Sequence, residues 1–254
     1  MDELKGKVAI VTGASTHRGI GNEIAKRFAK AGASVFLVAE ATQDQLDSTV
    51  QECRTYMDAG RIEAALIDLG EPGAPEHMVQ KAEELFGRVD VLINNAGIRM
   101  PANFGDYTRE QFDRVVSVNL AAPFFASQAV LPLMRRQGGG RIIHTASQLG
   151  HVTYPQRALY GLTKAALIHL TKSMAYELGR ENIIVNAISP GPIATMPTLN
   201  RPAEVTRKRV EQYIPAGRVG QPEEIAELAL YLASSSPAFL QGQDIVIDGG
   251  YIIH

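Results

Sequence analysis

Short apolar runs recur along the chain and predict the strands of a β-sheet. Most runs are four to six residues long, rich in Val and Ile, and nearly continuous rather than alternating with polar residues. Such runs are typical of strands that are covered on both faces, as in a parallel sheet. The predicted strands are residues 8–11, 35–39, 64–67, 89–93, 142–146, 183–188 and 245–247.

Helical patterns fill the intervals between these strands. Apolar residues recur at spacings of three and four over residues 24–29, 78–86 and 225–232, the last after Pro222, which suits the first turn of a helix. The alternation predicts an α/β fold with a doubly wound, Rossmann-type sheet of about seven parallel strands and helices on both faces. We expect a single domain, residues 1–254, with a lid over the substrate at about 191–217, where prolines interrupt the alternation.

Composition and charge narrow the classes of partner. The 25 Lys and Arg residues nearly balance the 27 Asp and Glu residues, and no basic stripe is present, which argues against a nucleic-acid partner. The N-terminus has no signal-peptide pattern, and no apolar run approaches the ~18 residues of a membrane span. We therefore expect a cytoplasmic protein with a small-molecule substrate and no membrane contact.

The cysteine and histidine residues do not suggest a metal centre. Cys53 is the only cysteine and shares an apolar helical face with Leu46 and Val50, so a buried structural thiol in a reducing compartment is expected. His144 lies in a predicted strand and is expected to be a core residue with satisfied hydrogen bonds. No metal is predicted, because no ligand spacing relates His17, His144, His169 and His254.

A glycine-rich turn follows the first predicted strand. The sequence TGASTHRGIG at residues 12–21 leads directly into a helical pattern. Glycines let the backbone approach a pyrophosphate, whose charge is offset by N–H groups at the helix N-terminus. The spacing alone would also suit a simple tight turn, but its position after the first strand of an α/β chain favours a dinucleotide site.

A second cluster combines Ser147, Tyr160 and Lys164. The spacing of four places Tyr160 and Lys164 on one face of a helix, and Ser147 ends the predicted strand before it. An adjacent ammonium group lowers the pKa of a tyrosine, ordinarily ~10, so that it can exchange a proton with an alcohol or a carbonyl. A Tyr–Lys pair at this spacing is common by chance, so it indicates a catalytic site only in combination with the other motifs.

Taken together, these motifs resemble the single-domain type of the short-chain dehydrogenase/reductase family over essentially the whole chain. Members that reduce 3-oxoacyl thioesters or oxidise polyols and sugars are the most similar in kind. The resemblance implies hydride transfer between a nicotinamide cofactor and the carbonyl or alcohol carbon of a substrate. The motifs occur in the family's order: residues 12–21, Asp68, residues 94–97 (NNAG), Asn119, Ser147, Tyr160 with Lys164, residues 190–195 and residues 248–250.

The resemblance also implies roles for individual residues. Tyr160 is the expected general acid/base, and Lys164 is expected to lower its pKa and bind the nicotinamide ribose. Ser147 would orient the substrate oxygen, and Asn119 would hold a water that links Lys164 to solvent. The implied cofactor-binding residues are Gly13, Ser15, Arg18, Gly19, Ile20, Glu40, Asp68, Leu69, Asn95, Ala96, Gly97, Tyr160, Lys164, Pro190, Gly191, Ile193 and Thr195.

The glycine-rich loop departs from the family pattern. Five residues separate Gly13 from Gly19, where the family usually has three. Divergent enoyl-thioester reductases of the superfamily also have a longer first loop, but they space Tyr and Lys by seven rather than four. The spacing in this chain therefore favours alcohol or carbonyl chemistry over enoyl reduction.

The end of the second predicted strand bears on the choice between NAD and NADP. Glu40 would repel a 2′-phosphate and could accept hydrogen bonds from the ribose diol. Arg18, just before Gly19, is a position where a basic residue often indicates NADP, but it could also pair with Glu40. Because an exposed ion pair is worth only ~0–1 kcal/mol, we predict NAD, with NADP as the alternative.

The remaining expectations concern the substrate and the assembly. A polar pocket wall predicts a small polar substrate such as a polyol, a sugar or a sugar-acid ketone, whose carboxylate Arg99 or Arg157 could pair. A solvated surface or a subunit contact is the alternative role for these arginines. The family implies a homotetramer, or a homodimer, that buries the apolar C-terminal tail. The candidate substrate residues are Arg99, Gln148, His151, Tyr154 and Arg157.

Two other functions remain open at this point. A 3-oxoacyl-thioester reductase would use the same catalytic residues on a larger substrate. A regulatory protein that binds NAD(P) without turnover would not need to keep Tyr160 and Lys164, so their presence argues against it.

Overall fold

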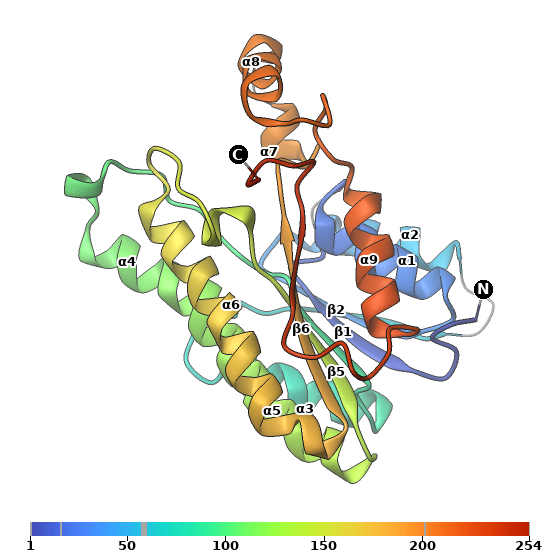
Figure 1. The fold of residues 1–254 in the computed structure, drawn as a ribbon. Coiled ribbons are helices and arrows are strands. Elements are labelled where there is room, and N and C mark those ends of the chain that lie inside the picture. Colours follow the sequence, from blue (N-terminus) through green and yellow to red (C-terminus); the bar gives the residue numbers. More distant parts are fainter. Residues whose placement is uncertain (1, 16, 57–59, 201, 254) are drawn as a thin grey trace.

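A seven-stranded parallel sheet forms the centre of the computed structural model, which describes residues 2–15, 17–56, 60–200 and 202–253 (Figure 1). The strand order is β3-β2-β1-β4-β5-β6-β7, and every neighbouring pair is parallel. This confirms the predicted sheet. The strands are β1 (Val8–Thr12), β2 (Ser34–Ala39), β3 (Ile62–Leu66), β4 (Val91–Asn94), β5 (Gly140–Thr145), β6 (Ile183–Pro190) and β7 (Asp244–Ile247).

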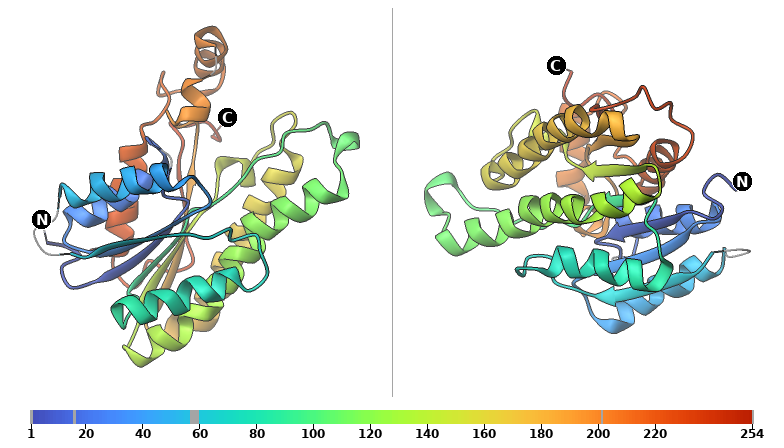
Figure 2. Two further views of the ribbon diagram at one scale, coloured as in Figure 1. Left: turned by 180° about the vertical axis from the view of Figure 1, so that it is seen from behind. Right: turned by 90° about the horizontal axis from the view of Figure 1, so that it is seen from below.

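Helices cover both faces of the sheet (Figures 1 and 2). Residues on alternate sides of a strand enter different cores: Val11 packs in the core beneath the helices of one face, whereas Ile10 packs in the core beneath the other. The apolar runs are continuous because both sides of each strand are buried. One face carries α1 (Ile20–Lys30), α2 (Gln43–Arg54) and α9 (Pro222–Ala233), and the other carries α3 (Ala74–Phe86), α5 (Ala122–Arg136) and α6 (Ala158–Leu178).

The order of the strands reverses between β1 and β4, which creates the position where α/β sheets bind ligands. From β1 the chain winds outward through β2 and β3, then returns to the other side of β1 at β4. The crevice at such a switch point opens at the carboxyl ends of the strands. The glycine-rich turn follows β1, and the NNAG segment ends β4, so both border this crevice.

One long helix runs from residue 109 to 136 and is interrupted by a π-helical turn. It consists of α4 (Arg109–Val116), the turn η2 (Ser117–Ala121) and α5. Among the described residues, this helix alone is long and apolar enough by composition to cross a membrane, and 44% of its most apolar window is buried in the fold. Ala126 and Val130 lie in the core against the sheet, whereas Phe124 and Phe125 face outward. The helix is therefore a covering helix of the sheet.

Two short helices stand beyond the carboxyl end of β6, where we expected irregular structure. They are α7 (Met196–Leu199) and α8 (Ala203–Tyr213), and both project from the body of the domain (Figures 1 and 2). No residue of α8 is buried. This segment is therefore held by few contacts, in contrast to the helices that flank the sheet.

Two expectations about single core residues have different outcomes. Cys53 is buried in α2, as predicted, and burial raises the pKa of its thiol to about 12. His144 is fully buried in β5, and its Nδ1 lies 3.2 Å from Nδ2 of Asn94. The prediction of a buried core histidine is confirmed, but among the described residues a hydrogen-bond partner is found only for Nδ1 and not for Nε2. Burial, with help from the positive charge of Lys164, lowers the pKa of His144 to about 3.

Candidate active site

Ser147, Tyr160 and Lys164 converge at the carboxyl end of β5. Ser147 follows the strand and caps the short turn η3 (Gln148–Gly150), where its hydroxyl accepts a hydrogen bond from the Leu149 amide. Tyr160 and Lys164 lie on successive turns of α6, and the Lys164 Nζ is 5.6 Å from the centre of the Tyr160 ring. Both Ser147 and Tyr160 line one pocket. Lys164 is buried beneath them and donates to the Thr145 carbonyl at 2.7 Å.

Asn119 occupies the π-helical turn rather than a regular helix. Its Oδ1 accepts from the Ile98 amide at 2.8 Å, and its Nδ2 donates to the Ile98 carbonyl and to the Thr163 hydroxyl. A Cβ placed on Gly97 would lie 3.5 Å from Asn119 Oδ1 and 3.4 Å from Lys164 Nζ, so both side chains face Gly97. Isolated π turns often occur at functional sites because the extra residue redirects one side chain. The sequence gives no local signal for this turn.

Burial controls the proton affinities of the catalytic pair. Desolvation lowers the pKa of Lys164 from its ordinary 10.5 to about 7, and the charge of Arg99 adds to the effect. Desolvation also raises the pKa of Tyr160, although Arg99, Ser147 and Arg157 oppose the shift. This differs from the expectation that a neighbouring Lys164 ammonium lowers the tyrosine pKa. In the protein alone, burial therefore favours the neutral forms of both Tyr160 and Lys164.

The glycine-rich turn packs closely against the segment after β4. Gly13 has a positive φ of 67°, and a Cβ on it would lie 2.8 Å from the Ala96 Cα. A Cβ on Gly21 would collide with the Gly13 carbonyl and lie 2.5 Å from Asn95 Nδ2. Gly19 caps α1 without a side-chain hydrogen bond, which leaves the first amides of the helix available to an anion. Thr16, part of the predicted longer loop, lies outside the described residues.

A cavity beside this turn brings together most of the predicted cofactor residues. A nicotinamide dinucleotide fits the chemistry of its lining, because it combines a glycine turn, the amides of a helix N-terminus and a carboxylate at the end of β2. The predicted residues that line it are Gly13, Ser15, Gly19, Ile20, Glu40, Asp68, Leu69, Asn95, Ala96, Gly97 and Thr195.

Other predicted cofactor residues lie elsewhere. Pro190, Gly191 and Ile193 line the adjoining pocket that contains Ser147 and Tyr160. Ile20, Arg99 and Thr195 line both cavities, so the two adjoin at these residues. Arg18 is exposed, has a positive φ of 54°, and lines neither cavity.

Arg114, which the sequence analysis missed, connects two of the predicted cofactor residues. Projecting from α4, it donates to Glu40 at 2.7 Å and to Asp68 at 2.9 Å. Glu40 therefore pairs with Arg114 and not with Arg18. Burial alone would raise the pKa of Asp68, but hydrogen bonds from Arg114 and the Gly70 amide outweigh it and hold that pKa below its usual value.

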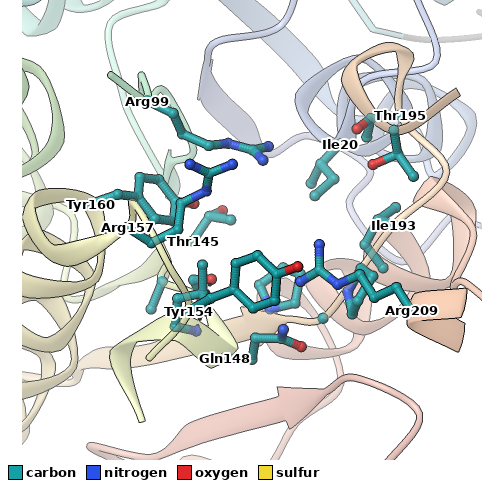
Figure 3. A pocket seen from close by; sticks show the side chains of 17 residues that line it. Ile20, Arg99, Thr145, Gln148, Tyr154, Arg157, Tyr160, Ile193, Thr195 and Arg209 are labelled. Atoms are coloured by element: carbon teal, nitrogen blue, oxygen red, sulfur yellow. Dashed lines mark hydrogen bonds between the residues drawn. The ribbon is translucent and has the colours of Figure 1, made fainter. Parts of the chain in front are cut away.

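The pocket around Tyr160 contains four of the five predicted substrate residues. Figure 3 shows Arg99, Gln148, Tyr154 and Arg157 around its opening. His151 does not line it; its Nε2 is 2.5 Å from the Asp244 carboxylate. The pocket also includes Thr198 and Arg209 from the helical segment after β6, which the sequence analysis did not single out. Nothing in the local sequence indicates that α8 folds back toward Tyr154.

Comparisons with known proteins identify relatives along nearly the whole chain. The family model described as Enoyl-(Acyl carrier protein) reductase matches residues 13–252. A 3-oxoacyl-[acyl-carrier-protein] reductase from Thermotoga maritima is 38% identical over 250 residues, which cover 98% of this chain and 99% of the relative.

Solved structures share the fold. A short-chain dehydrogenase/reductase from Serratia marcescens superposes with a TM-score of 0.91 at 35% identity, covering 98% of this chain and 99% of that one. A 7α-hydroxysteroid dehydrogenase in complex with NADH and 7-oxo glycochenodeoxycholic acid also has a TM-score of 0.91 and 35% identity, covering 99% and 96%. The substrates named for these relatives differ widely in size, so the fold alone does not identify the substrate of this chain.

Proposed function

This chain belongs to the short-chain dehydrogenase/reductase family and is an NAD(P)-dependent oxidoreductase of CH–OH groups, and on that premise we propose that Tyr160 is its general acid/base. The observation that carries the assignment is the convergence of Ser147, Tyr160 and Lys164 in a pocket that adjoins the glycine-lined cavity. When bound, the nicotinamide cofactor supplies or accepts the hydride.

The chain's own residues manage the proton and the orientation of the substrate. Ser147 donates to the substrate oxygen and holds it beside Tyr160. In reduction, the Tyr160 hydroxyl gives its proton to that oxygen, and burial, which raises the pKa of Tyr160, keeps the proton available at neutral pH. The positive charge of Arg99, together with that of Lys164 when its amino group is protonated, stabilises the phenolate that remains. In oxidation the same proton moves in the opposite direction.

Asn119 and Lys164 form the proposed support of this proton transfer. Asn119 fixes the backbone at Ile98 from within the π turn, and both side chains face Gly97. Lys164 is anchored on the Thr145 carbonyl, which aims its ammonium toward the site. We assign Asn119 the role of holding a water through which Lys164 exchanges protons with solvent.

The preferred cofactor in this proposal is NAD. Glu40 lines the cofactor cavity at the end of β2, where a carboxylate accepts from a ribose diol and repels a 2′-phosphate. The structural relative that binds NADH supports this choice. NADP is the alternative, and it rests on Arg114 rather than on Arg18, because Arg114 partly neutralises Glu40 and would pair with a phosphate.

The proposed substrate is small and polar. Arg99, Gln148 and Arg157 make the pocket wall polar. The buried Oε1 of Gln148 has no hydrogen-bond partner within the described part of the chain, and a substrate hydroxyl would supply one. The alternative is a 3-oxoacyl thioester, which is favoured by the similarity to the Thermotoga maritima reductase. In either case the segment at about 191–217 acts as a lid, because α7 and α8 contribute to the pocket while making few contacts with the rest of the fold.

The proposed assembly is a homotetramer, or a homodimer, in the cytoplasm. Phe124 and Phe125 on α5, and Tyr176 on α6, are exposed, with Tyr176 at 92%. Exposed aromatic side chains that lie side by side, as Phe124 and Phe125 do with ring centres 5.3 Å apart, commonly mark a protein interface. A second copy of this chain is the proposed occupant, since closed symmetric assemblies are the usual form of soluble oligomers.

A substrate panel tests the proposed function. The purified chain is incubated with NADH or NADPH and a set of ketones, 3-oxoacyl thioesters and sugar acids, and with NAD or NADP and the matching alcohols, while cofactor absorbance is followed. We expect turnover of small polar substrates with the NAD pair. Turnover of thioesters alone would favour the alternative, and cofactor binding without turnover of any panel member would favour a regulatory role.

A further inference from the structure

The pocket around Tyr160 is positively charged. Three arginines line it, and none of the described residues in its lining is acidic. Figure 3 shows Arg99 and Arg157 on the side of Tyr160, whereas Arg209 reaches in from the opposite side, beside Tyr154. A pocket that holds three guanidinium groups without a carboxylate is suited to a negatively charged ligand.

Arg209 has a buried donor atom that forms no hydrogen bond with any described residue. This atom is its Nε, and the group forms no ion pair with a described residue. Arg207, two positions earlier on α8, contrasts with it, because it pairs with both Glu204 and Glu211. The acidic residues of this helix therefore neutralise the outward-facing arginine and leave the pocket-facing one free.

Aromatic rings hold Arg209 in place. Its guanidinium carbon lies 4.9 Å from the centre of the Tyr154 ring and 5.5 Å from that of Tyr251. Contacts of this kind stabilise a cation without using its N–H donors. The side chain is thus positioned in the pocket, and its terminal amino groups form no hydrogen bond with a described residue, so they can bind a ligand there.

The other two arginines are placed for different tasks. Arg99 lies over the Tyr160 ring and also lines the cofactor cavity, so it belongs to the reacting end of the pocket. Arg157 already donates to the Gln156 carbonyl. Arg209 lines the substrate pocket but not the cofactor cavity, and it is the guanidinium at the end remote from Tyr160.

We propose that the substrate carries a carboxylate or phosphate group and that Arg209 binds this group, while the carbonyl or hydroxyl to be converted lies at Ser147 and Tyr160. The proposal rests on the function proposed above and specifies its substrate class. A guanidinium binds either oxyanion through paired hydrogen bonds, which orients the ligand as well as holding it. Arg209 is therefore a specificity-determining residue carried by the lid.

The position of Arg209 on α8 also links substrate charge to the lid. No residue of α8 is buried, and Arg209 connects this helix to the rest of the fold through its contacts with Tyr154 and Tyr251. An anion bound to Arg209 would add a further contact between α8 and the pocket. A charged substrate would thereby favour the closed position of the lid, whereas a neutral one would not.

Matched pairs of carbonyl compounds test this inference. The pairs are acetoacetate with methyl acetoacetate, and dihydroxyacetone phosphate with dihydroxyacetone. Each is measured with NADH and the full-length chain, as KM where the compound is reduced and as Ki against the best panel substrate where it is not. We expect the charged member of at least one pair to bind more tightly, and the pair that responds distinguishes a carboxylate from a phosphate.

Arg209→Gln and Arg207→Gln are the matched variants. We expect Arg209→Gln to weaken binding of the charged member of the pair about tenfold to a hundredfold, because charge-assisted hydrogen bonds are lost. Binding of the neutral member and of NADH should stay unchanged. Arg207→Gln removes a cation from the outer face of the same helix, and it should change the KM or Ki of neither the charged nor the neutral member.

Two outcomes would overturn the inference. One is equal or tighter binding of the neutral member in both pairs. The other is equal weakening of both members by Arg209→Gln, which would show that Arg209 only supports α8 through its aromatic contacts. In both cases continued reduction of neutral panel substrates would leave the proposed function intact, whereas absence of turnover across the whole panel with both cofactors would reject that function instead.

Discussion

At the scale of single residues, burial determines what the catalytic groups can do. Tyr160 and Lys164 share a face of α6, but desolvation moves their pKa values in opposite directions, upward for the tyrosine and downward for the lysine. Both shifts favour the neutral forms. In the protein alone, Tyr160 is therefore held in the protonated form from which it can donate a proton.

Removal of the Tyr160 hydroxyl tests its role. We expect Tyr160→Phe to lower kcat about a hundredfold to ten-thousandfold, the usual contribution of a general acid, while the affinity for NADH changes little. Steady-state kinetics and NADH fluorescence titration measure the two quantities. Tyr231→Phe, at an exposed position on α9, is the control. Activity in Tyr160→Phe close to that of the wild type would contradict the assignment.

The contact of Arg114 with Glu40 gives a second prediction at this scale. Glu40→Gln removes the charge that repels a 2′-phosphate, whereas Arg114→Gln removes the cation that neutralises that charge. We expect the ratio of kcat/KM for NADH to that for NADPH to fall about tenfold in Glu40→Gln and to rise in Arg114→Gln. A shift of the ratio in the same direction in both variants would show that the ion pair does not control cofactor choice.

At the scale of elements, close packing between β1, α1 and the segment after β4 forms the cofactor turn. The side-chain Nδ2 of Asn95 donates to the Thr12 carbonyl at 2.9 Å and to the Gly13 carbonyl at 3.3 Å. Gly21, in the first turn of α1, approaches both Gly13 and Asn95 without room for a Cβ. The phosphate-binding geometry therefore depends on contacts among three elements rather than on the loop alone.

Gly21→Ala tests this dependence. The added methyl group has to displace the Gly13 backbone, so we expect a loss of about 1–3 kcal/mol of unfolding free energy, typical of overpacking, and a clear loss of NADH affinity. Urea unfolding and calorimetric titration measure these effects. Gly105→Ala is the matched control, since a Cβ there meets no atom within 4 Å. Equal effects of the two substitutions would contradict the packing argument.

The sequence predicted the elements whose determinants are local and missed those that depend on tertiary contacts. The strands and the shared face of Tyr160 and Lys164 follow from apolar runs and helical spacing, and the structure has both. The contacts of Arg114 with Glu40 and Asp68 join residues 74 and 46 positions apart, and no local pattern encodes them. The approach of Arg209 to Tyr154 depends likewise on how the segment after β6 folds back.

At the scale of the whole molecule, the burial of the catalytic Lys164 makes the stability of the folded chain depend on pH. The unfolded chain holds the Lys164 proton up to about pH 10.5, whereas the folded chain without cofactor releases it at about pH 7. Between these values the unfolded state binds more protons, so stability rises with pH. Above about pH 9 the Cys53 thiol, whose pKa burial raises to about 12, contributes the opposite slope.

The quantity to measure is therefore the slope of the unfolding free energy against pH between about pH 7 and about pH 9. We expect the unfolding free energy of the cofactor-free chain to increase over this window, and the increase to be smaller in Lys164→Met. Lys208→Met, at an exposed site on α8, should keep the slope of the wild type. A slope unaffected by Lys164→Met would show that this lysine stays charged in the folded chain.

Self-association is the other prediction at this scale. If the exposed face of α5 contacts a second copy, replacing Phe124 and Phe125 by Ser removes apolar area from the interface. We expect sedimentation velocity to show a multimer for the wild type and smaller species for the double variant. Replacement of the fully exposed Phe239 by Ser is the control. A monomeric wild type would reject the proposed assembly.

The way the glycine turn is fixed has a consequence for how this protein can change. Gly13 is bound to the segment after β4 on one side of the long loop, and Gly19 begins α1 on the other. Because each end is held by its own packing, the number of residues between them can vary while the turn stays in place. We expect that shortening this loop to the three-residue form preserves NADH affinity. If so, the length of this loop can change during evolution or by engineering without loss of cofactor binding.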